Sequence, residues 1–433
     1  MPGKPKRYRT RATLAGLAAL LAAATAACGS GGGSGSSSGG KATITFAWWG
    51  NSSRAASTLA AIKLFEKAHP NITVQTEYTP FGSYDQKIDT QAAGGDTPDL
   101  ITIDRSVQTE WTQRGLLANL GSYVGKSLTL SGMNPAFVAS GKSNGTQYAV
   151  PMAQNSQSIV VDQTRVQSLG LPMPQDGWTW PQWQAWAKQV TAKSHGKYYG
   201  LVDPGTLWPG FTSWEIQHGT SLYGNGKIRF TAADLTAWWT MCTQLRTSGA
   251  ATNAQLTATV DGLPDDEPLL KGHAVAEWDY DSLYTMYTAG TSDKLTLVSL
   301  PTVNGKSGMF AQPSMMLGVA ANSPHAEQAV ELLNFLVNDP TAAKTLGTSR
   351  GLFPNLSARQ SLAGAASGTV KEVYDYESSV AGQLAATPPA APKGDSQLLT
   401  LMQTMYQKVA FGQLSPAAAA QQFYTQAQGI VGQ

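Results

Sequence analysis

The sequence contains little charge and almost no cysteine. Charged residues make up 13% of the 433-residue chain, about half the share usual in soluble proteins, and the two cysteines are Cys28 and Cys242. Two cysteines in such different contexts form neither a disulfide framework nor a cysteine-based zinc site. The five histidines are scattered without metal-ligand spacing, and the chain has no HExxH motif and no phosphate loop. We therefore expect no metal ion and no cofactor.

Positive charge is concentrated at the amino terminus. Five of the 30 Lys and Arg residues lie within residues 4–11, so the rest of the chain carries 25 of them against 28 Asp and Glu residues. A mildly acidic chain without a basic cluster lacks the electrostatic features of a nucleic-acid-binding protein. We therefore expect no nucleic-acid partner.

The first forty residues resemble the export signal of a bacterial lipoprotein. An apolar stretch at residues 14–24 follows the cations and is too short for a membrane-spanning helix. Small residues then lead to Cys28, which a Gly/Ser tract follows. The sequence predicts a signal peptide at 1–27, a lipidated Cys28 with a flexible linker at 28–41, and attachment by this lipid anchor to the outer face of the bacterial cytoplasmic membrane. The alternative is an ordinary secretory signal, cleaved near residues 24–26.

Strand and helix patterns alternate from residue 42 onward. Strands are predicted at 42–49, 72–74 and 98–104, and helices at 54–69 and 84–93. This alternation predicts an α/β fold with an open, mostly parallel sheet, whose ligands bind beyond the carboxyl ends of the strands. Trp49, Asn51 and Asp104 lie at these ends and are candidate ligand-binding residues. The alternative for Trp49 is a side chain that seals the edge of the sheet.

Other aromatic residues repeat with helical spacing, which predicts buried helix faces rather than ligand contacts. These residues are Trp183, Trp186 and Val190 on one helix, and Leu235, Trp238, Trp239, Cys242 and Leu245 on another. On such a face Cys242 is expected to be a small buried hydrophobic residue and not a nucleophile. Earlier in the chain, residues 145–152 are predicted to form a strand that leaves the first α/β unit, and residues 158–162 are predicted to form a strand that enters the second.

Several stretches, in their order along the chain, resemble the family 1 extracellular solute-binding proteins, the carbohydrate-binding lipoproteins of ABC importers. The stretches lie at residues 46–51, 65–74, 84–100, 114–120, 148–151, 270–279 and 319–337. The resemblance covers residues 42–433. It implies two α/β lobes joined by crossing segments, as in periplasmic binding proteins, with lobe 1 at 42–150 plus 303–345 and lobe 2 at 151–302 plus 346–433.

The resemblance implies a monomeric sugar receptor that closes around a mono- or oligosaccharide and delivers it to the permease of an ABC transporter. It adds these ligand-binding candidates: Tyr84 in a matching stretch, Gln154 and Asn155 past the first crossing, Trp208, Phe211 and Trp214 in a loop-rich stretch, Trp278, Asp279, Tyr280 and Asp281 in a turn after a strand at 273–277, and Arg350. The turn is alternatively a solvated one, and Arg350 alternatively caps the preceding helix.

The expected protein is therefore a receptor and not an enzyme. A secreted glycoside hydrolase is the alternative of a different class, because Asp104 and Asp279 provide the two carboxylates that such an enzyme requires. A receptor for a polar solute other than a sugar is the nearer alternative.

Overall fold

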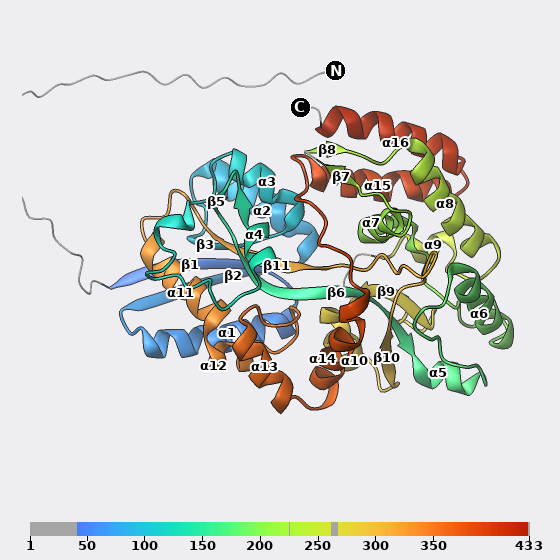
Figure 1. Ribbon diagram of the computed structural model, residues 1–433, viewed down its shortest axis with the longest axis horizontal. Coiled ribbons are helices and arrows are strands. Elements are labelled where there is room, and N and C mark those ends of the chain that lie inside the picture. Colours follow the sequence, from blue (N-terminus) through green and yellow to red (C-terminus); the bar gives the residue numbers. More distant parts are fainter. Residues whose placement is uncertain (1–40, 225, 261–266, 432–433) are drawn as a thin grey trace, which may run out of the picture. The chain divides into compact units, whose positions relative to one another are not determined.

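The computed structural model describes residues 41–224, 226–260 and 267–431 (Figure 1). Cys28 and the signal peptide predicted before it lie outside the described residues, so both stay predictions. Within the described ranges, every helix is too short or too polar to cross a bilayer.

A mixed sheet links the two halves of the described chain, with the strand order β10-β6-β11-β3-β1-β2 and with β9 paired to β6. Its strands are β1 (Ala42–Trp49), β2 (Ile72–Thr79), β3 (Leu100–Ile103), β6 (Val150–Asp162), β9 (Ala276–Tyr280), β10 (Leu295–Val298) and β11 (Ala311–Val319). β1 pairs in parallel with β2 and β3, as the alternating pattern predicts. The pairings of β6 and β11 are antiparallel. Two small hairpins are formed by β4 (Lys142–Ser143) with β5 (Thr146–Gln147) and by β7 (Tyr223–Gly224) with β8 (Lys227–Ile228).

The crossing segment is one continuous strand, whereas the sequence pattern predicts two. The first half of β6 pairs with β11, from Val150 opposite Leu317 to Ser156 opposite Ala311. Its second half pairs with β9 and β10. The sequence predicts a break at residues 153–157, but residues 153–156 pair with β11 and Gln157 pairs with β9. β6 therefore continues through the predicted break (Figure 1).

Helices cover both faces of the parallel strands and surround the far end of β6. Figure 1 shows α2, α3 and α4 on one side of β1–β3 and α1, α11 and α12 on the other. The helices are α1 (Ser52–Ala68), α2 (Phe81–Gly94), α3 (Arg105–Gln113), α4 (Pro135–Ser140), α5 (Gln163–Ser168), α6 (Trp180–Lys193), α7 (Trp208–Gln217), α8 (Ala232–Thr247), α9 (Ala254–Thr257), α10 (Tyr284–Ala289), α11 (Ala326–Asn338), α12 (Pro340–Leu346), α13 (Leu356–Ala365), α14 (Gly368–Val380), α15 (Asp395–Ala410) and α16 (Pro416–Val431).

Two large hydrophobic clusters hold these elements. The first cluster draws its buried residues from 44–152 and 315–358, and the second from 159–309 and 376–427. β6 contributes to both, with Val150 and Met152 in the first and Ile159 and Val161 in the second. The chain therefore crosses from one core to the other along β6. The lobe boundaries given above stay a prediction.

The residues predicted on helix faces are buried, which confirms their place in the core. Trp183, Trp186 and Val190 on α6 are at most 3% exposed, and the five predicted residues of α8 at most 2%. Cys242 is fully buried, and burial raises the pKa of its thiol well above the ordinary value. The thiol is therefore protonated at neutral pH and is not an activated nucleophile.

Truncation of Trp239 is expected to destabilise the fold. Its indole N–H donates to the carbonyl of Gly205 at 3.0 Å, and its ring lies 5.9 Å from the ring of Tyr406. Trp239→Ala should lower the free energy of unfolding by about 3–5 kcal/mol, because it leaves a cavity in the second cluster. Urea denaturation measures this, with Phe411→Ala as the control. Phe411 is 47% exposed, so its loss should change stability by less than about 0.5 kcal/mol. Equal losses in both variants would contradict this placement of the core.

Candidate functional site

Three helices begin directly after the carboxyl ends of the parallel strands β1, β2 and β3. Asn51 precedes α1, and its side-chain oxygen accepts a hydrogen bond from the backbone N–H of Arg54 at 3.1 Å. Asp104 precedes α3, and its Oδ1 accepts hydrogen bonds from the backbone N–H of Ser106 at 2.9 Å and from its hydroxyl at 2.5 Å. Both candidates are therefore helix caps, which gives each side chain a structural role at the edge of the sheet where ligands bind in such folds.

Asp104 lies among ionisable groups from three other elements. Burial, followed by the charge of Asp104, raises the pKa of Asp85 on α2 to about 8. The same two causes, in the same order, raise the pKa of Tyr280 on β9. Burial also raises the pKa of Asp395 on α15 to about 7, against a hydrogen bond from Tyr223 and with a further contribution from Asp104. The charge of Asp104 thus acts on carboxyl groups from the first and the last third of the chain.

Hydrogen bonds through Arg105 and Gln312 connect the start of α3 with Tyr280, across the two halves of the chain. Arg105, the first residue of α3, donates from Nη1 to Gln312 Oε1 at 2.9 Å, and Gln312 Nε2 donates to the hydroxyl of Tyr280 at 2.8 Å. Arg105 Nη2 also donates to the carbonyl of Pro388 at 3.0 Å. We call this group the polar cluster; its members are Asp85, Asp104, Arg105, Tyr280, Gln312 and Asp395.

Asp279 lies on strand β9, whereas the sequence predicts a turn there; its side chain faces Tyr287 and not the polar cluster. Its carboxylate accepts hydrogen bonds from the backbone N–H of Tyr280 at 2.7 Å and from the hydroxyl of Tyr287 at 3.0 Å. Burial outweighs these two bonds and raises the pKa of Asp279 to about 8. The strand continues to Tyr280 because its residues pair with Gln157–Val161 of β6, a partner that the local sequence does not reveal.

The tryptophans expected to present free ring faces are buried, which corrects that expectation. Trp49 is 5% exposed and packs in the first cluster against Phe81 and Tyr84. Its neighbour Trp48 is also buried, so neither ring of the pair is free. Trp278 is 5% exposed and packs in the second cluster, 6.0 Å from the ring of Trp180. Large apolar rings at a strand end gain more from packing under a helix than from exposure.

Tyr84 is a core residue rather than a ligand-binding one, which is a second correction. It is 1% exposed, and its hydroxyl lies within hydrogen-bond distance of the carbonyl oxygens of Ala47 and Thr102, which share its single hydrogen, while it accepts from the N–H of Thr102. These bonds fix α2 over the junction of β1 and β3.

The stretch with Trp208, Phe211 and Trp214 is a helix, α7, and not a loop. Pro209 lies in its first turn, and the three aromatics recur every third residue along it. Phe211 is fully buried in the second cluster, so its assignment as a ligand-binding residue is wrong. Trp208 is 8% exposed in the same cluster, and the half-buried Trp214 packs against Trp180 and Trp238.

Gln154, Asn155 and Asp281 are engaged in hydrogen bonds at the crossing. Gln154 accepts from Arg359 Nη1 at 3.0 Å and donates to Glu377 at 3.3 Å. Asn155 donates to Ser282 Oγ at 3.3 Å. Asp281, the residue after β9, is fully buried and accepts a hydrogen bond from the backbone N–H of Ser156 at 3.0 Å, which links the end of β9 to β6. The structure assigns these three side chains to the crossing itself, which corrects Asp281 as a solvated or ligand-facing residue.

Arg350 is 3% exposed and donates to the hydroxyl of Thr58 on α1. It therefore does not cap the helix that precedes it. Its surroundings are described below, because they differ in charge from the polar cluster.

Sequence reasoning missed four members of the polar cluster: Asp85, Arg105, Gln312 and Asp395. Arg105 and Asp85 could have been found, since each lies in the first turn or two of a helix that follows a parallel strand. Gln312 is opposite Asn155 only because of the register of β11 with β6. Asp395 has no local signal that connects it with Asp104.

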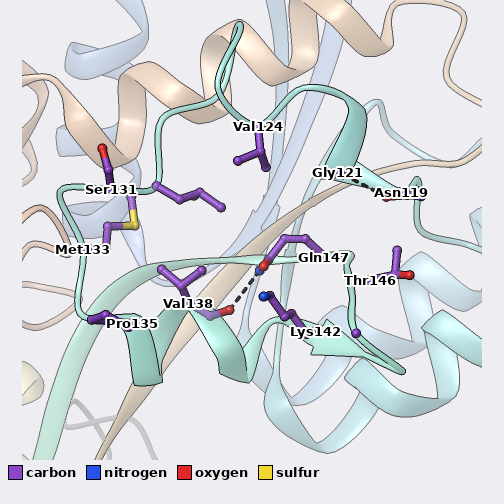
Figure 2. A pocket seen from close by; sticks show the side chains of 12 residues that line it. Asn119, Gly121, Val124, Ser131, Met133, Pro135, Val138, Lys142, Thr146 and Gln147 are labelled. Atoms are coloured by element: carbon purple, nitrogen blue, oxygen red, sulfur yellow. Dashed lines mark hydrogen bonds between the residues drawn. The ribbon is translucent and has the colours of Figure 1, made fainter.

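A separate hollow of about 650 Å³ lies in the first half of the chain. Figure 2 shows its walls, which include Val124, Met133 and Val138 together with Lys142 and Gln147. Gln147 Nε2 donates there to the carbonyl of Val138 at 3.0 Å. None of the predicted ligand-binding residues lines this hollow. It also lacks the group of carboxyls with raised pKa values that marks the polar cluster, so we place the candidate site at the latter.

The polar cluster can both donate and accept hydrogen bonds at neutral pH. Carboxyl groups with a pKa near 7 or 8 are partly protonated there, and a protonated carboxyl donates while an ionised one only accepts. Arg105 adds a planar set of donors and Gln312 an amide. The described residues contain no group of three or more His, Cys, Asp or Glu side chains arranged to hold a metal ion. The arrangement is suited to a ligand with many hydroxyl groups.

The raised pKa values predict that stability falls as pH rises. Asp85, Asp279 and Asp395 have folded-state pKa values above the ordinary 3.8, so the folded protein binds protons more tightly than the unfolded chain does. The stability that these groups contribute when protonated is fully present below about pH 4, and it is lost as pH rises through about 7 to 8. Thermal melts should show a decreasing Tm over this range. Asp279→Asn should reduce the decrease and raise Tm at the alkaline end.

Asp375→Asn is the control for this prediction, because Asp375 is exposed and pairs only with Lys371 on the surface of α14. It should leave the dependence of Tm on pH unchanged. A Tm that is constant or rises between pH 5 and 8 would contradict the raised pKa values.

Comparison with known proteins gives the same picture of the fold. Residues 49–343 match the family described as bacterial extracellular solute-binding protein. An uncharacterized lipoprotein in the oleD 5′ region of Streptomyces antibioticus is 25% identical over 422 residues, which cover 89% of this chain and 85% of that protein.

Two solved structures share the fold over nearly the whole chain. A periplasmic oligogalacturonide-binding protein from Yersinia enterocolitica, in complex with saturated digalacturonic acid, is 24% identical with a TM-score of 0.80 and covers 90% of this chain and 98% of its own. The ABC substrate-binding protein Lmo0181 from Listeria monocytogenes, in complex with cycloalternan, is 21% identical with a TM-score of 0.79 and covers 90% and 99%. The fold is the two-lobed α/β fold of periplasmic solute-binding proteins, and the chain belongs to the family of bacterial extracellular solute-binding proteins.

Proposed function

We propose that this protein is the sugar receptor of an ABC importer and that it holds a mono- or oligosaccharide at the polar cluster. One observation carries this proposal: Arg105 at the start of α3 is joined through Gln312 to the hydroxyl of Tyr280 on β9, and the charge of Asp104 acts on Tyr280 and on Asp395 of α15. α3 packs in the first hydrophobic cluster, whereas β9 and α15 pack in the second. A ligand at Asp104 would therefore touch both halves of the chain.

The chemistry of the cluster supports a saccharide. Each sugar hydroxyl is both a donor and an acceptor, and the partly protonated Asp85 and Asp395 offer both functions as well. Arg105 and Gln312 add fixed planar groups that suit neighbouring hydroxyls. The two structural neighbours named above bind an oligogalacturonide and cycloalternan respectively, which are both saccharides.

Contacts from both halves also explain how binding would be coupled to closure. A ligand shifts a conformational equilibrium only by the difference between its affinities for the two states. Groups on α3 and on β9 can act together on one ligand only when the halves are close, so a ligand that uses both favours the closed state. The closed form is then what the permease receives.

Asp104→Asn is expected to weaken binding without weakening the fold. Asparagine caps a helix as well as aspartate does, so α3 keeps its cap while the cluster loses a charge. In isothermal titration, affinity for the saccharide should fall by about 1.5–3 kcal/mol, the size of one hydrogen bond to a charged group. The titrated saccharide is the one that raises Tm most in a panel of neutral and acidic mono- and disaccharides.

Asp339→Asn provides a matched control. Asp339 caps α12 through the N–H and hydroxyl of Thr341, just as Asp104 caps α3 through Ser106, but it lies outside the polar cluster. It should bind the saccharide like the wild type. The same saccharide should be recovered unchanged after long incubation; cleavage that is lost in Asp104→Asn or Asp279→Asn would instead establish the hydrolase. If no saccharide raises Tm and another polar solute does, the receptor has a different ligand.

We further propose that Cys28 carries the lipid that attaches the protein to the outer face of the membrane. The chain belongs to an extracellular family, and the Streptomyces relative is named as a lipoprotein. Cys28→Ser should shift the protein from the membrane fraction to the medium, or leave its precursor unprocessed, because serine has no thiol to acylate. Immunoblots of both fractions and mass spectrometry of the amino terminus measure this. An unmodified mature amino terminus at another residue in the wild type would contradict the anchor.

A further inference from the structure

Two buried arginines lie together at the start of α1. Arg54 is 7% exposed and Arg350 is 3% exposed. Arg54 donates from Nη2 to the carbonyl of Ser349 at 2.7 Å, and Arg350 donates from Nη2 to the hydroxyl of Thr58. Thr58 in turn donates to the carbonyl of Arg54 at 2.7 Å. Each guanidinium therefore lies beside the backbone that carries the other one.

No acidic side chain of the described residues compensates these two charges. Neither arginine forms a salt bridge there, and three of their N–H groups have no acceptor in the described chain: Arg54 Nε, Arg350 Nε and Arg350 Nη1. The hydroxyl of Thr348, on the same segment as Arg350, is also buried without a partner. A buried unpaired ion costs several kcal/mol. Burial lowers the pKa of Arg54 to about 10, and burial followed by the charge of Arg54 lowers that of Arg350.

Two half-buried arginines elsewhere in the described chain show what these two lack. Arg246 lies 2.8 Å from a carboxylate oxygen of Asp203, and Arg165 lies 2.9 Å from one of Asp162. Both of these arginines are thus neutralised by an internal acid. Arg105 and Arg359 form no ion pair with the described residues, but each donates to neighbouring carbonyl and amide oxygens. The pair at α1 differs in its buried N–H groups that have no acceptor in the described chain.

The surroundings of the pair add to its positive potential. The amino terminus of α1, a helix of 17 residues, contributes the positive end of the helix dipole. Gly50 lies two residues before the start of this helix with φ of +152°, and a Cβ there would come within 2.6 Å of the Arg54 side chain. The backbone at the end of β1 is therefore packed against Arg54 and holds it in place.

We propose that Arg54 and Arg350 form a binding site for an oxyanion. A guanidinium presents parallel N–H groups that match two oxygens of a carboxylate, sulfate or phosphate. The site lies at the carboxyl end of β1, and the backbone of Gln154 on β6 pairs with Leu352 just beyond Arg350. The oxyanion comes either from an acidic saccharide, through its carboxylate, or from a free inorganic ion. The first source rests on the proposed function, whereas the site itself does not.

Thermal melts of the purified protein test the site with two matched pairs of probes. Sodium sulfate is compared with sodium chloride at equal ionic strength, and sodium D-glucuronate with D-glucose. The wild type should show a saturable rise in Tm with sulfate, glucuronate or both. In Arg350→Gln the apparent Kd for that anion should increase roughly tenfold or more, as expected for the loss of a charge-assisted hydrogen bond. A response to glucuronate but not to sulfate identifies the saccharide carboxylate as the source, and the reverse identifies the inorganic ion.

Arg359→Gln is the control variant. Arg359 is bonded to the carbonyl of Phe353 at 2.8 Å and to Gln154 at 3.0 Å, so its replacement should lower Tm while the response to the anion persists. Without oxyanions, Arg350→Gln should melt no lower than the wild type, because it removes an uncompensated buried charge. Arg54→Gln repeats the test from the side of α1.

The proposal is overturned if neither anion gives a saturable rise in the wild type, or if the rise is the same in Arg350→Gln and Arg54→Gln. Its failure is distinguishable from that of the proposed function. Binding of neutral saccharides without any response to anions would leave the receptor intact and remove only this site. A response to sulfate without binding of any saccharide would do the opposite.

Discussion

The pairing of β6 with β11 is the constraint on which the rest of the structure depends. Through this antiparallel ladder one strand of 13 residues belongs to two hydrophobic cores. The register of the ladder sets Gln312 opposite Asn155, and Gln312 in turn links Arg105 to Tyr280. A slip by one residue would turn every side chain of β11 to the other face of the sheet. The polar cluster would then lose its bridge between the two halves of the chain.

The polar cluster exists because buried carboxyl groups can lose their charge. Burial makes ionisation of Asp85 and Asp395 costly, and the charge of Asp104 adds to this cost for both. Raised pKa values relieve this cost and leave groups that both donate and accept hydrogen bonds. The raised pKa values that make the protein less stable at alkaline pH are thus the same property that suits the polar cluster to a hydroxyl-rich ligand.

Local patterns in the sequence predicted what local forces decide. Helical spacing correctly placed Trp183 and Trp239 in the core. The strand-end pattern places Asp104 before α3, where its charge acts on Tyr280 of β9, and its role in ligand binding stays a proposal. The failures have a common cause in partners distant along the chain. Tyr84 is held by strands β1 and β3 and Trp278 by Trp180 and Trp238. Asp395 reaches the cluster from a helix that no nearby residue connects with α3.

The polar cluster and the pair of Arg54 and Arg350 differ in how the free-energy cost of a buried charge can be relieved. A buried carboxyl escapes the cost of ionisation by taking up a proton near neutral pH, as Asp85 does with a pKa of about 8. A guanidinium has no such route, because even the lowered pKa of Arg54, about 10, leaves it protonated in any physiological medium. The proposed oxyanion would meet the charge of the arginine pair. The described chain supplies an acid to Arg246 and to Arg165 but none to this pair, so an anion bound there would supply the compensating charge, and it would give the ligand a polarity that hydroxyl recognition alone does not.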